Sequence, residues 1–281
     1  MKKNYSKEDQ AKTDVAWRKL RARIENEEVI EERVSKSRLP LRPVLSYAAA
    51  FLLIITVVTL LITNRKNEGE LFAVTITNDT PGTTFVTKLD DGSYIYLSER
   101  ATVVHPQKFN SSKREVELSG EAYFEIARDE NKPFIIEAGD AIIEVLGTTF
   151  DLLSKEGETK ISVRSGRIKI SHIKSGESVE VSAGESAVAG ESGLAKYITE
   201  DHEHFNKYSS RMHFKDEYLA NITDVINRTF PDTKIELEQG LEIRELTATF
   251  TGDNPDSMVQ LICSAMELKY KREGGVIKIH Q

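Results

Sequence analysis

The pattern of hydrophobic and polar positions contains one uninterrupted apolar run, VLSYAAAFLLIITVVTLLI, from Val44 to Ile62. A helix of these 19 residues would be about 28 Å long, close to the ~30 Å hydrocarbon core of a bilayer. The run has no charged residue, Gly or Pro, whereas a buried core helix normally keeps polar positions on one side. It also begins too far from Met1 for a cleaved signal peptide. The pattern predicts a single transmembrane helix over 44–62.

Basic residues flank the apolar run unequally. Lys36, Arg38 and Arg42 precede it, whereas Arg65 and Lys66 follow it. Because basic flanks favour the cytoplasmic side, we expect the N-terminus in the cytoplasm and the C-terminal bulk in the periplasm. The predicted location is therefore the inner (cytoplasmic) membrane, crossed once.

Before the membrane segment, residues 1–43 carry charges of both signs and one apolar stripe. Trp17, Leu20 and Ile24 recur at i, i+3 and i+7, which places them on one face of a helix. So few apolar side chains cannot form a core of their own, and such a helix commonly orders against a partner groove. The alternative is a membrane-proximal linker helix whose stripe is incidental.

After a polar tether over 63–80, the hydrophobic period changes to two. The runs around Asp90-Asp91-Gly92-Ser93 predict a hairpin, and short β-rich runs separated by turn residues continue to about Ala189. These further strands are expected at 115–118, 122–127, 134–137, 141–146, 160–163, 167–171, 179–181 and 186–189. Residues 81–190 are therefore predicted to form an all-β domain, either a sandwich or a β-helix-like stack.

A polar, glycine-containing linker is expected over 191–211, and the pattern then alternates between strand and helix. Leu219, Ile222, Ile226 and Phe230 fall on one helical face, with Asp216 as a candidate N-cap. Asn254-Pro255 predicts the start of a second helix, with its Met258, Leu261, Ile262 and Ala265 facing inward. Gly274-Gly275 predicts a tight hairpin near the C-terminus. The predicted order over 212–281 is β-α-β-β-α-β-β, a small α+β domain following the all-β domain of this membrane-anchored, multi-domain chain.

Composition narrows the function. A formal net charge of −7 and a pI near 5.6 argue against direct nucleic-acid binding, which needs a basic surface. Cys263 is the only cysteine and falls in a core-helix pattern, so no internal disulfide is expected. His202 and His204 lack a third ligand for a metal, and no nucleophile elbow or phosphate loop occurs in its proper context. We expect no cofactor, no metal and no enzymatic activity.

The bond between Gly147 and Thr148 is the one position with candidate chemistry. A strained turn that held the Gly147 carbonyl against the Thr148 hydroxyl would permit an N→O acyl shift and cleavage of the chain. The alternative is that Gly147 only permits a tight bend.

The middle segment resembles the FecR family of periplasmic signalling domains. Matching pieces occur in family order over about a hundred residues: Leu89–Ser93, Tyr96–Ser98, His105–Phe109, Arg114–Val116, Leu118–Ala127, Pro133-Phe134, Val145–Asp151, Val163–Gly166 and Ala183–Glu185. Ser98 and Asp151 depart from the Asn usual in the family. The last 70 residues are similar to the small STN fold, and the Trp17 stripe is similar to a sigma-binding segment.

This resemblance implies a transmembrane anti-sigma factor or regulator. Its head would bind an extracytoplasmic-function sigma factor through Trp17, Leu20 and Ile24. Its periplasmic part would receive a signal from an outer-membrane TonB-dependent transducer. The alternative is a membrane-tethered protein that binds envelope or glycan material and has no transcriptional role.

Overall fold

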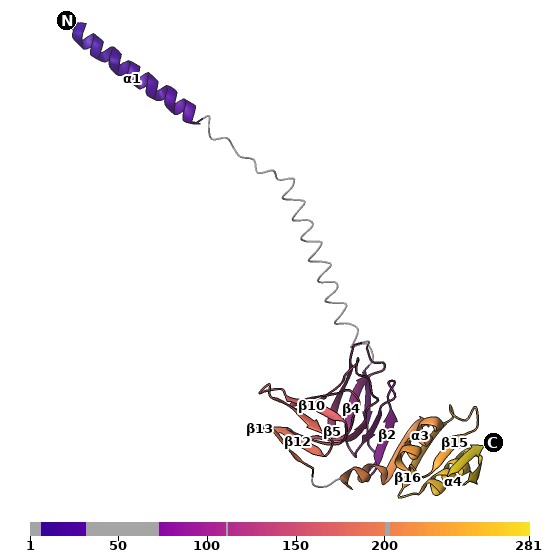
Figure 1. Cartoon of the computed structure of the whole chain (residues 1–281). Helices are drawn as coiled ribbons and strands as arrows, with labels where there is room; N and C mark the ends of the chain where they lie inside the picture. The colour runs from indigo at the N-terminus through magenta and orange to yellow at the C-terminus, as the bar shows by residue number, and fades with distance from the viewer. Residues whose placement is uncertain (1–6, 32–72, 111, 200–202) are drawn as a thin grey trace. The chain divides into compact units, whose positions relative to one another are not determined.

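A computed structural model of the chain describes residues 7–31, 73–110, 112–199 and 203–281 (Figure 1). The chain divides into two compact units, Met1–Arg65 and Lys66–Gln281. Within the described ranges, no helix is both long and apolar enough to cross a membrane. The transmembrane helix predicted over 44–62 lies outside the described residues.

The first unit contains one described element, helix α1 (Lys7–Glu31). It includes the predicted apolar stripe and continues without a break through Glu27 and Glu28. The prediction of a helix in the N-terminal head is confirmed for these residues.

The second unit is rich in strands up to residue 198. The first six are β1 (Ala73–Thr77), β2 (Thr84–Lys88), β3 (Tyr94–Leu97), β4 (Thr102–Pro106), β5 (Arg114–Glu125) and β6 (Phe134–Ala138). The next seven are β7 (Ala141–Val145), β8 (Thr149–Lys155), β9 (Glu158–Ser165), β10 (Arg167–His172), β11 (Ser178–Ser182), β12 (Glu185–Gly190) and β13 (Gly193–Ile198).

Strand β5 belongs to two sheets and joins them. Its first half pairs with β4 and β6, in the order β1-β4-β5-β6-β7-β10-β11. Its second half pairs with β3 and β8, in a sheet that runs β13-β12-β9-β8-β5-β3-β2. The strand turns between the sheets at Gly120, whose φ of 95° and close approach to the Ala101 backbone exclude a side chain. The result is a sandwich that nearly closes into a barrel.

Alternation of buried and exposed residues places one core between the two sheets. In β6 and β7 every second residue is buried, including Phe134, Ile136, Ile143 and Val145. These side chains pack with Phe124 and other inward residues of the second sheet. The predicted all-β region is therefore confirmed in its sandwich form.

The C-terminal region has the predicted order of elements. These are β14 (Arg211–Tyr218), α3 (Leu219–Thr229), β15 (Lys234–Leu237), β16 (Glu245–Thr251), α4 (Pro255–Met266), β17 (Lys269–Glu273) and β18 (Val276–His280). Strands β15, β18 and β17 form a separate sheet, whereas β14 pairs with β16 on one side and with β2 on the other. The side chain of Asn254 accepts a hydrogen bond from the Ser257 N–H and caps α4 as predicted.

Other local predictions were wrong. Asp216 does not cap α3, because it lies in a β-bulge; the first α3 amides, of Leu219 and Ala220, donate to backbone carbonyls of Arg244 and Glu242 instead. Leu261 is 49% exposed and Ala265 is also exposed, while the inner face of α4 carries Met258, Val259, Ile262, Cys263 and Met266.

The predicted tether and linker contain more regular structure than expected. Strand β1 lies within 63–80, because Ile76 packs against the sandwich core while the edge of β4 supplies hydrogen bonds. Strand β13 and the 3₁₀ helix η1 (Glu203–Ser209) lie within 191–211. Strand β8 was not predicted, although Phe150 and Leu152 are fully buried in it.

A buried ion pair fixes the turn between β2 and β3 to the start of β5. Arg114, 1% exposed, donates from Nη1 to Asp91 Oδ2 at 2.7 Å and to the Ala127 carbonyl at 2.8 Å. Its Nε donates to the Lys132 carbonyl at 2.9 Å. Asp91 also accepts from the backbone and hydroxyl of Ser93, and the Ser93 hydroxyl accepts from the Ala127 amide. The Asp-Gly turn thus holds three separate segments together.

Substitution Asp91→Ala is expected to lower the free energy of unfolding by about 3–5 kcal/mol, because the Arg114 charge would remain buried without its partner. Glu115→Ala is the control, since it removes an ion pair with Lys113 in which both side chains are more than 40% exposed. That loss should cost less than about 1 kcal/mol. Urea unfolding of the three chains measures both; equal losses would contradict the role of the buried pair.

Candidate functional site

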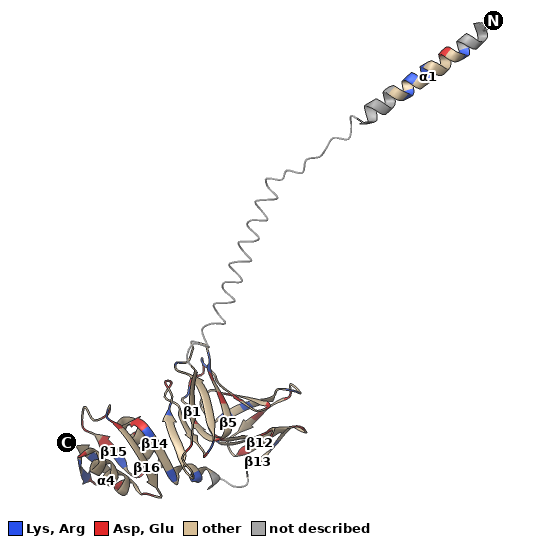
Figure 2. Cartoon of the chain, turned by 180° about the vertical axis from the view of Figure 1, so that it is seen from behind, with Lys and Arg blue, Asp and Glu red and all other residues tan. Residues whose placement is uncertain are grey.

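The apolar stripe of α1 is exposed. Trp17 is 59% exposed, and Leu20 and Ile24 are each 49% exposed. The described side chains of this helix include five basic residues and one acidic residue: Lys12, Arg18, Lys19, Arg21, Arg23 and Asp14 (Figure 2). An apolar strip with basic neighbours would suit a hydrophobic groove with an acidic rim.

The predicted processing bond lies in the connection from β7 to β8, where the backbone is tightly packed. A Cβ atom on Gly147 would come within 2.6 Å of the Arg128 Cα, so no larger residue fits without a backbone shift. The carbonyls on either side of Gly147 are both engaged: Leu146 accepts from the Asp129 amide and Thr148 from the Ile126 amide. The bend interpretation of Gly147 therefore has a sufficient physical reason.

Thr148 is 2% exposed, and its hydroxyl donates to the Arg167 carbonyl at 2.9 Å. Gly166 lies against the same bond, since a Cβ there would be 3.0 Å from the Thr148 hydroxyl and 3.1 Å from the Gly147 carbonyl oxygen. An open cavity of about 700 Å³ borders these residues and includes Leu146 and Glu180. The hydroxyl is thus adjacent to the predicted bond, but its hydrogen bond goes to a backbone carbonyl, which is a weak proton acceptor.

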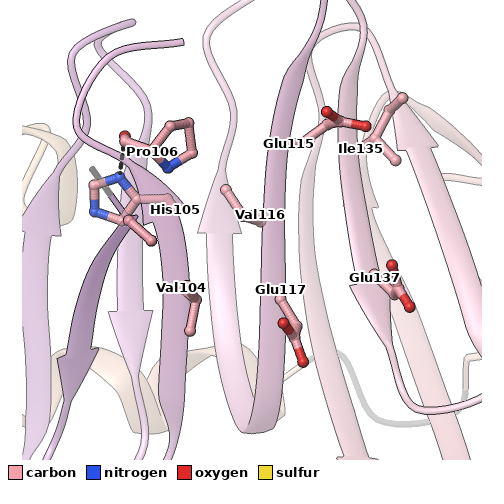
Figure 3. A pocket seen from close by; sticks show the side chains of 9 residues that line it. Val104, His105, Pro106, Glu115, Val116, Glu117, Ile135 and Glu137 are labelled. Atoms are coloured by element: carbon pink, nitrogen blue, oxygen red, sulfur yellow. Dashed lines mark hydrogen bonds between the residues drawn. The ribbon is translucent and has the colours of Figure 1, made fainter. Parts of the chain in front are cut away.

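A second, smaller cavity of about 260 Å³ opens where β4 diverges from β5 beyond Val104. Figure 3 shows three glutamates from β5 and β6 at this cavity, with the His105 ring lying apart from them. The His105 Nδ1 lies 2.8 Å from the Pro106 carbonyl oxygen. Among the described residues no group of His, Cys, Asp and Glu could hold a metal ion, and His202 of the earlier pair lies outside them.

Sequence reasoning missed the contact between the sandwich and the C-terminal region. Tyr94, Tyr96 and Tyr123 face away from the sandwich core and join a second core with α3, α4 and η1. The available signal was the run Tyr94–Leu97, all four residues of which are buried. Such an unalternating strand indicates a sheet covered on both faces.

Polar contacts accompany this second core. The Tyr94 hydroxyl donates to Asp224 Oδ2 of α3 at 2.7 Å, and Lys88 donates to Asn221 at 3.2 Å. Arg228 of α3 pairs with Asp224 and lies 3.7 Å from Glu125 at the end of β5. Burial raises the pKa of Glu125 above its ordinary value, against the opposing effect of Arg228.

The connecting helix η1 contributes aromatic side chains to the same face. Tyr208 stacks on Tyr123 with ring centroids 5.3 Å apart, and its hydroxyl donates to Asp151 of β8. Arg164 donates to the Tyr123 hydroxyl at 3.1 Å, yet burial still raises the pKa of Tyr123 to about 12. The connecting helix η1 therefore contacts β8, the strand that follows the predicted processing bond.

Comparison with known proteins identifies one family. Residues 78–169 match the family model described as FecR protein, which confirms the predicted resemblance over this third of the chain. No curated protein matches the chain.

Two crystal structures of a candidate anti-sigma factor from Parabacteroides distasonis ATCC 8503, at 2.50 and 1.65 Å resolution, resemble it. Each is 20% identical and the alignment covers 75% of this chain and 99% of the other, with TM-scores of 0.46 and 0.44. Scores below 0.5 do not establish a common fold, so the FecR resemblance rests on the match over residues 78–169.

If the bond between Gly147 and Thr148 is cleaved, prolonged incubation of the full-length chain should yield the fragments 1–147 and 148–281. The Thr148 hydroxyl oxygen would attack the Gly147 carbonyl carbon, the peptide C–N bond would break, and water would hydrolyse the resulting ester. Thr148→Ser keeps the hydroxyl and should still be cut, whereas the isosteric Thr148→Val should stay intact. Denaturing gels measure this; a native chain that remains one band would leave only the bend interpretation.

The pH dependence of stability provides a test of Glu125 at the second core. Because its folded-state pKa is raised above 4.5, the neutral form is favoured by folding, and this contribution is lost as the pH rises through the folded pKa. Glu125→Gln lacks this titration, so its stability relative to the native chain should increase from below pH 4.5 to above the raised pKa. Urea unfolding across this range measures the difference, and parallel curves would contradict burial as the dominant effect.

Proposed function

We propose that this chain, which carries a FecR domain over residues 78–169, is a non-enzymatic regulator in sigma-factor signalling. More specifically, it acts as a transmembrane anti-sigma factor or regulator whose cytoplasmic head binds an extracytoplasmic-function sigma factor. The observation that carries the proposal is the FecR match, since the family resemblance implies this role.

The described head supports the sigma-binding part of the proposal. In α1 the side chains of Trp17, Leu20 and Ile24 are exposed on one face, although exposed large apolar residues are costly unless a partner covers them. The basic residues around them would favour an acidic partner surface.

The apolar run 44–62 supports anchoring in the inner membrane, with the sandwich and the C-terminal region exported. There they receive a signal from the signalling domain of an outer-membrane TonB-dependent transducer. The STN-like region, 212–281, is the proposed receiver, because its element order is that of a compact α+β module.

Substitution of Trp17, Leu20 and Ile24 by Ala is expected to abolish capture of one sigma factor by the full-length chain. Each truncation at a binding hot spot costs more than about 1 kcal/mol, so three together should weaken binding by about 100-fold or more. The matched control is Val15→Ala/Lys19→Ala, which truncates exposed residues on the opposite face of the same helix.

Tagged chains are compared by pull-down against each sigma factor of the source cell. Retention by the native chain and the control, with loss by the triple variant, supports the proposal. Capture of no sigma factor by the native chain would contradict it and favour a membrane-tethered binder of envelope material. Because Ala is the best helix former, loss of the helix would not explain the triple variant's effect.

A further inference from the structure

Strand β16 ends the longest sheet, and among the described residues its outer edge has no strand partner, although the Thr251 amide at its end donates to the Asp253 carboxylate at 2.7 Å. It pairs antiparallel with β14, which pairs with β2 on its other side. A free edge presents a row of unpaired backbone N–H and C=O groups, and another β-strand satisfies such a row in register.

The edge lacks the usual devices that prevent strand addition. From Leu246 to Thr251 the sequence LTATFT has no charge and no Pro. The irregularity in this strand pair lies on the inner strand, where Lys215 and Asp216 together oppose Thr247. Strand β16 itself therefore stays regular, and its Thr247, Thr249 and Thr251 side chains are exposed.

Other outer edges in the described residues differ. Strands β11, β13, β15 and β17 each carry a charged residue in the interior of the strand, Glu180, Lys196, Glu236 and Lys271, whereas the one charged residue of β16, Glu245, is its first residue. Strand β1 is also uncharged, but it adjoins residues outside the described range. A charge in the interior of an edge strand discourages pairing with another strand. Among the described edges, β16 therefore is the one that has no interior charge and whose neighbouring residues are also described.

The sequence of β16 is complementary to itself. In an antiparallel pair centred on Ala248, Thr247 opposes Thr249 of the other copy, and Leu246 opposes Phe250. The pair of Leu246 and Phe250 then lies on the buried face of the joined sheet. The pair of Thr247 and Thr249 lies on its exposed face, where two neutral β-branched side chains meet. The same pairing of β11 about Glu180, or of β17 about Lys271, would place like charges opposite each other.

We propose that β16 is a homodimerisation edge, at which two copies of this chain pair antiparallel about a two-fold axis through Ala248. The two sheets join into one across the axis. The interface is isologous, so each copy supplies the same strand. This inference does not depend on the identity of the sigma factor or the transducer.

Disulfide trapping tests the register. Full-length chains with Thr247→Cys and differently tagged chains with Thr249→Cys are co-expressed and oxidised. Directly opposed residues have Cα atoms about 4.5–5.5 Å apart, within the range of a disulfide. We expect a disulfide dimer between the two different variants. Either variant alone should give little dimer, because the two copies of residue 247, or of residue 249, lie diagonally across the strand pair rather than opposite each other. The native chain is the control for Cys263, which is buried.

Charge substitution tests the interface without a cross-link. Thr247→Lys/Thr249→Lys places Lys opposite Lys at both positions and should leave the full-length chain monomeric by analytical ultracentrifugation. Thr247→Glu/Thr249→Lys changes the same two residues but places Glu opposite Lys, so it should remain dimeric. Since both variants lose the same threonine hydrogen bonds, a folding defect would affect them alike.

A monomeric native chain, or cross-linking that is equal for the mixed and single variants, would overturn the proposal. A cysteine at 247 or 249 that links to a different protein would also overturn it, by assigning the edge to another partner. A monomeric Thr247→Lys/Thr249→Lys chain together with a dimeric Thr247→Glu/Thr249→Lys chain supports the two-fold register.

Discussion

The ion pair between Asp91 and Arg114 is the constraint on which the sandwich depends. A guanidinium that is 1% exposed is costly to bury, and here one carboxylate and two backbone carbonyls accept hydrogen bonds from its Nε and Nη1, while its Nη2 is buried without a hydrogen-bond partner among the described residues. Those three acceptors come from the β2–β3 turn, the segment after β5 and the segment before β6. Strand β5, which the two sheets share, is therefore held by this side chain as well as by its backbone pairing with β3, β4, β6 and β8.

The sequence was informative where a local pattern determined the structure. Asn254-Pro255 and Gly274-Gly275 predicted a helix start and a hairpin because capping and turn chemistry act over a few residues. The sequence predicted two strands, 115–118 and 122–127, where the structure has the single strand β5. Ser119-Gly120 is the reason, since the residues that favour a turn also allow a strand to bend from one sheet into another. Asp216 was misassigned as a cap because its position is fixed by Thr247 across the strand pair, 31 residues away.

Of the candidate sites, the sequence located the α1 stripe and the Gly147–Thr148 bond, but neither their function nor the second core. Tyr94, Tyr96 and Tyr123 belong to strands that are read as part of an independent all-β domain. Only the arrangement of α3 and η1 shows that their outer face is covered. The FecR region and the C-terminal region consequently share one core, and α3 contacts side chains of β2, β3 and β5 directly.

The parallel pair between β2 and β14 joins residues that are 128 positions apart, Thr84 and Met212. Contacts with such long sequence separation form late, because the loop between them must close before they contribute any stability. During synthesis, the tyrosine face of the sandwich would remain uncovered until the last 70 residues have emerged. The C-terminal region thus covers an apolar surface that would otherwise favour aggregation of the newly made chain. Because this region is synthesised last, the sandwich can fold before its tyrosine face is covered.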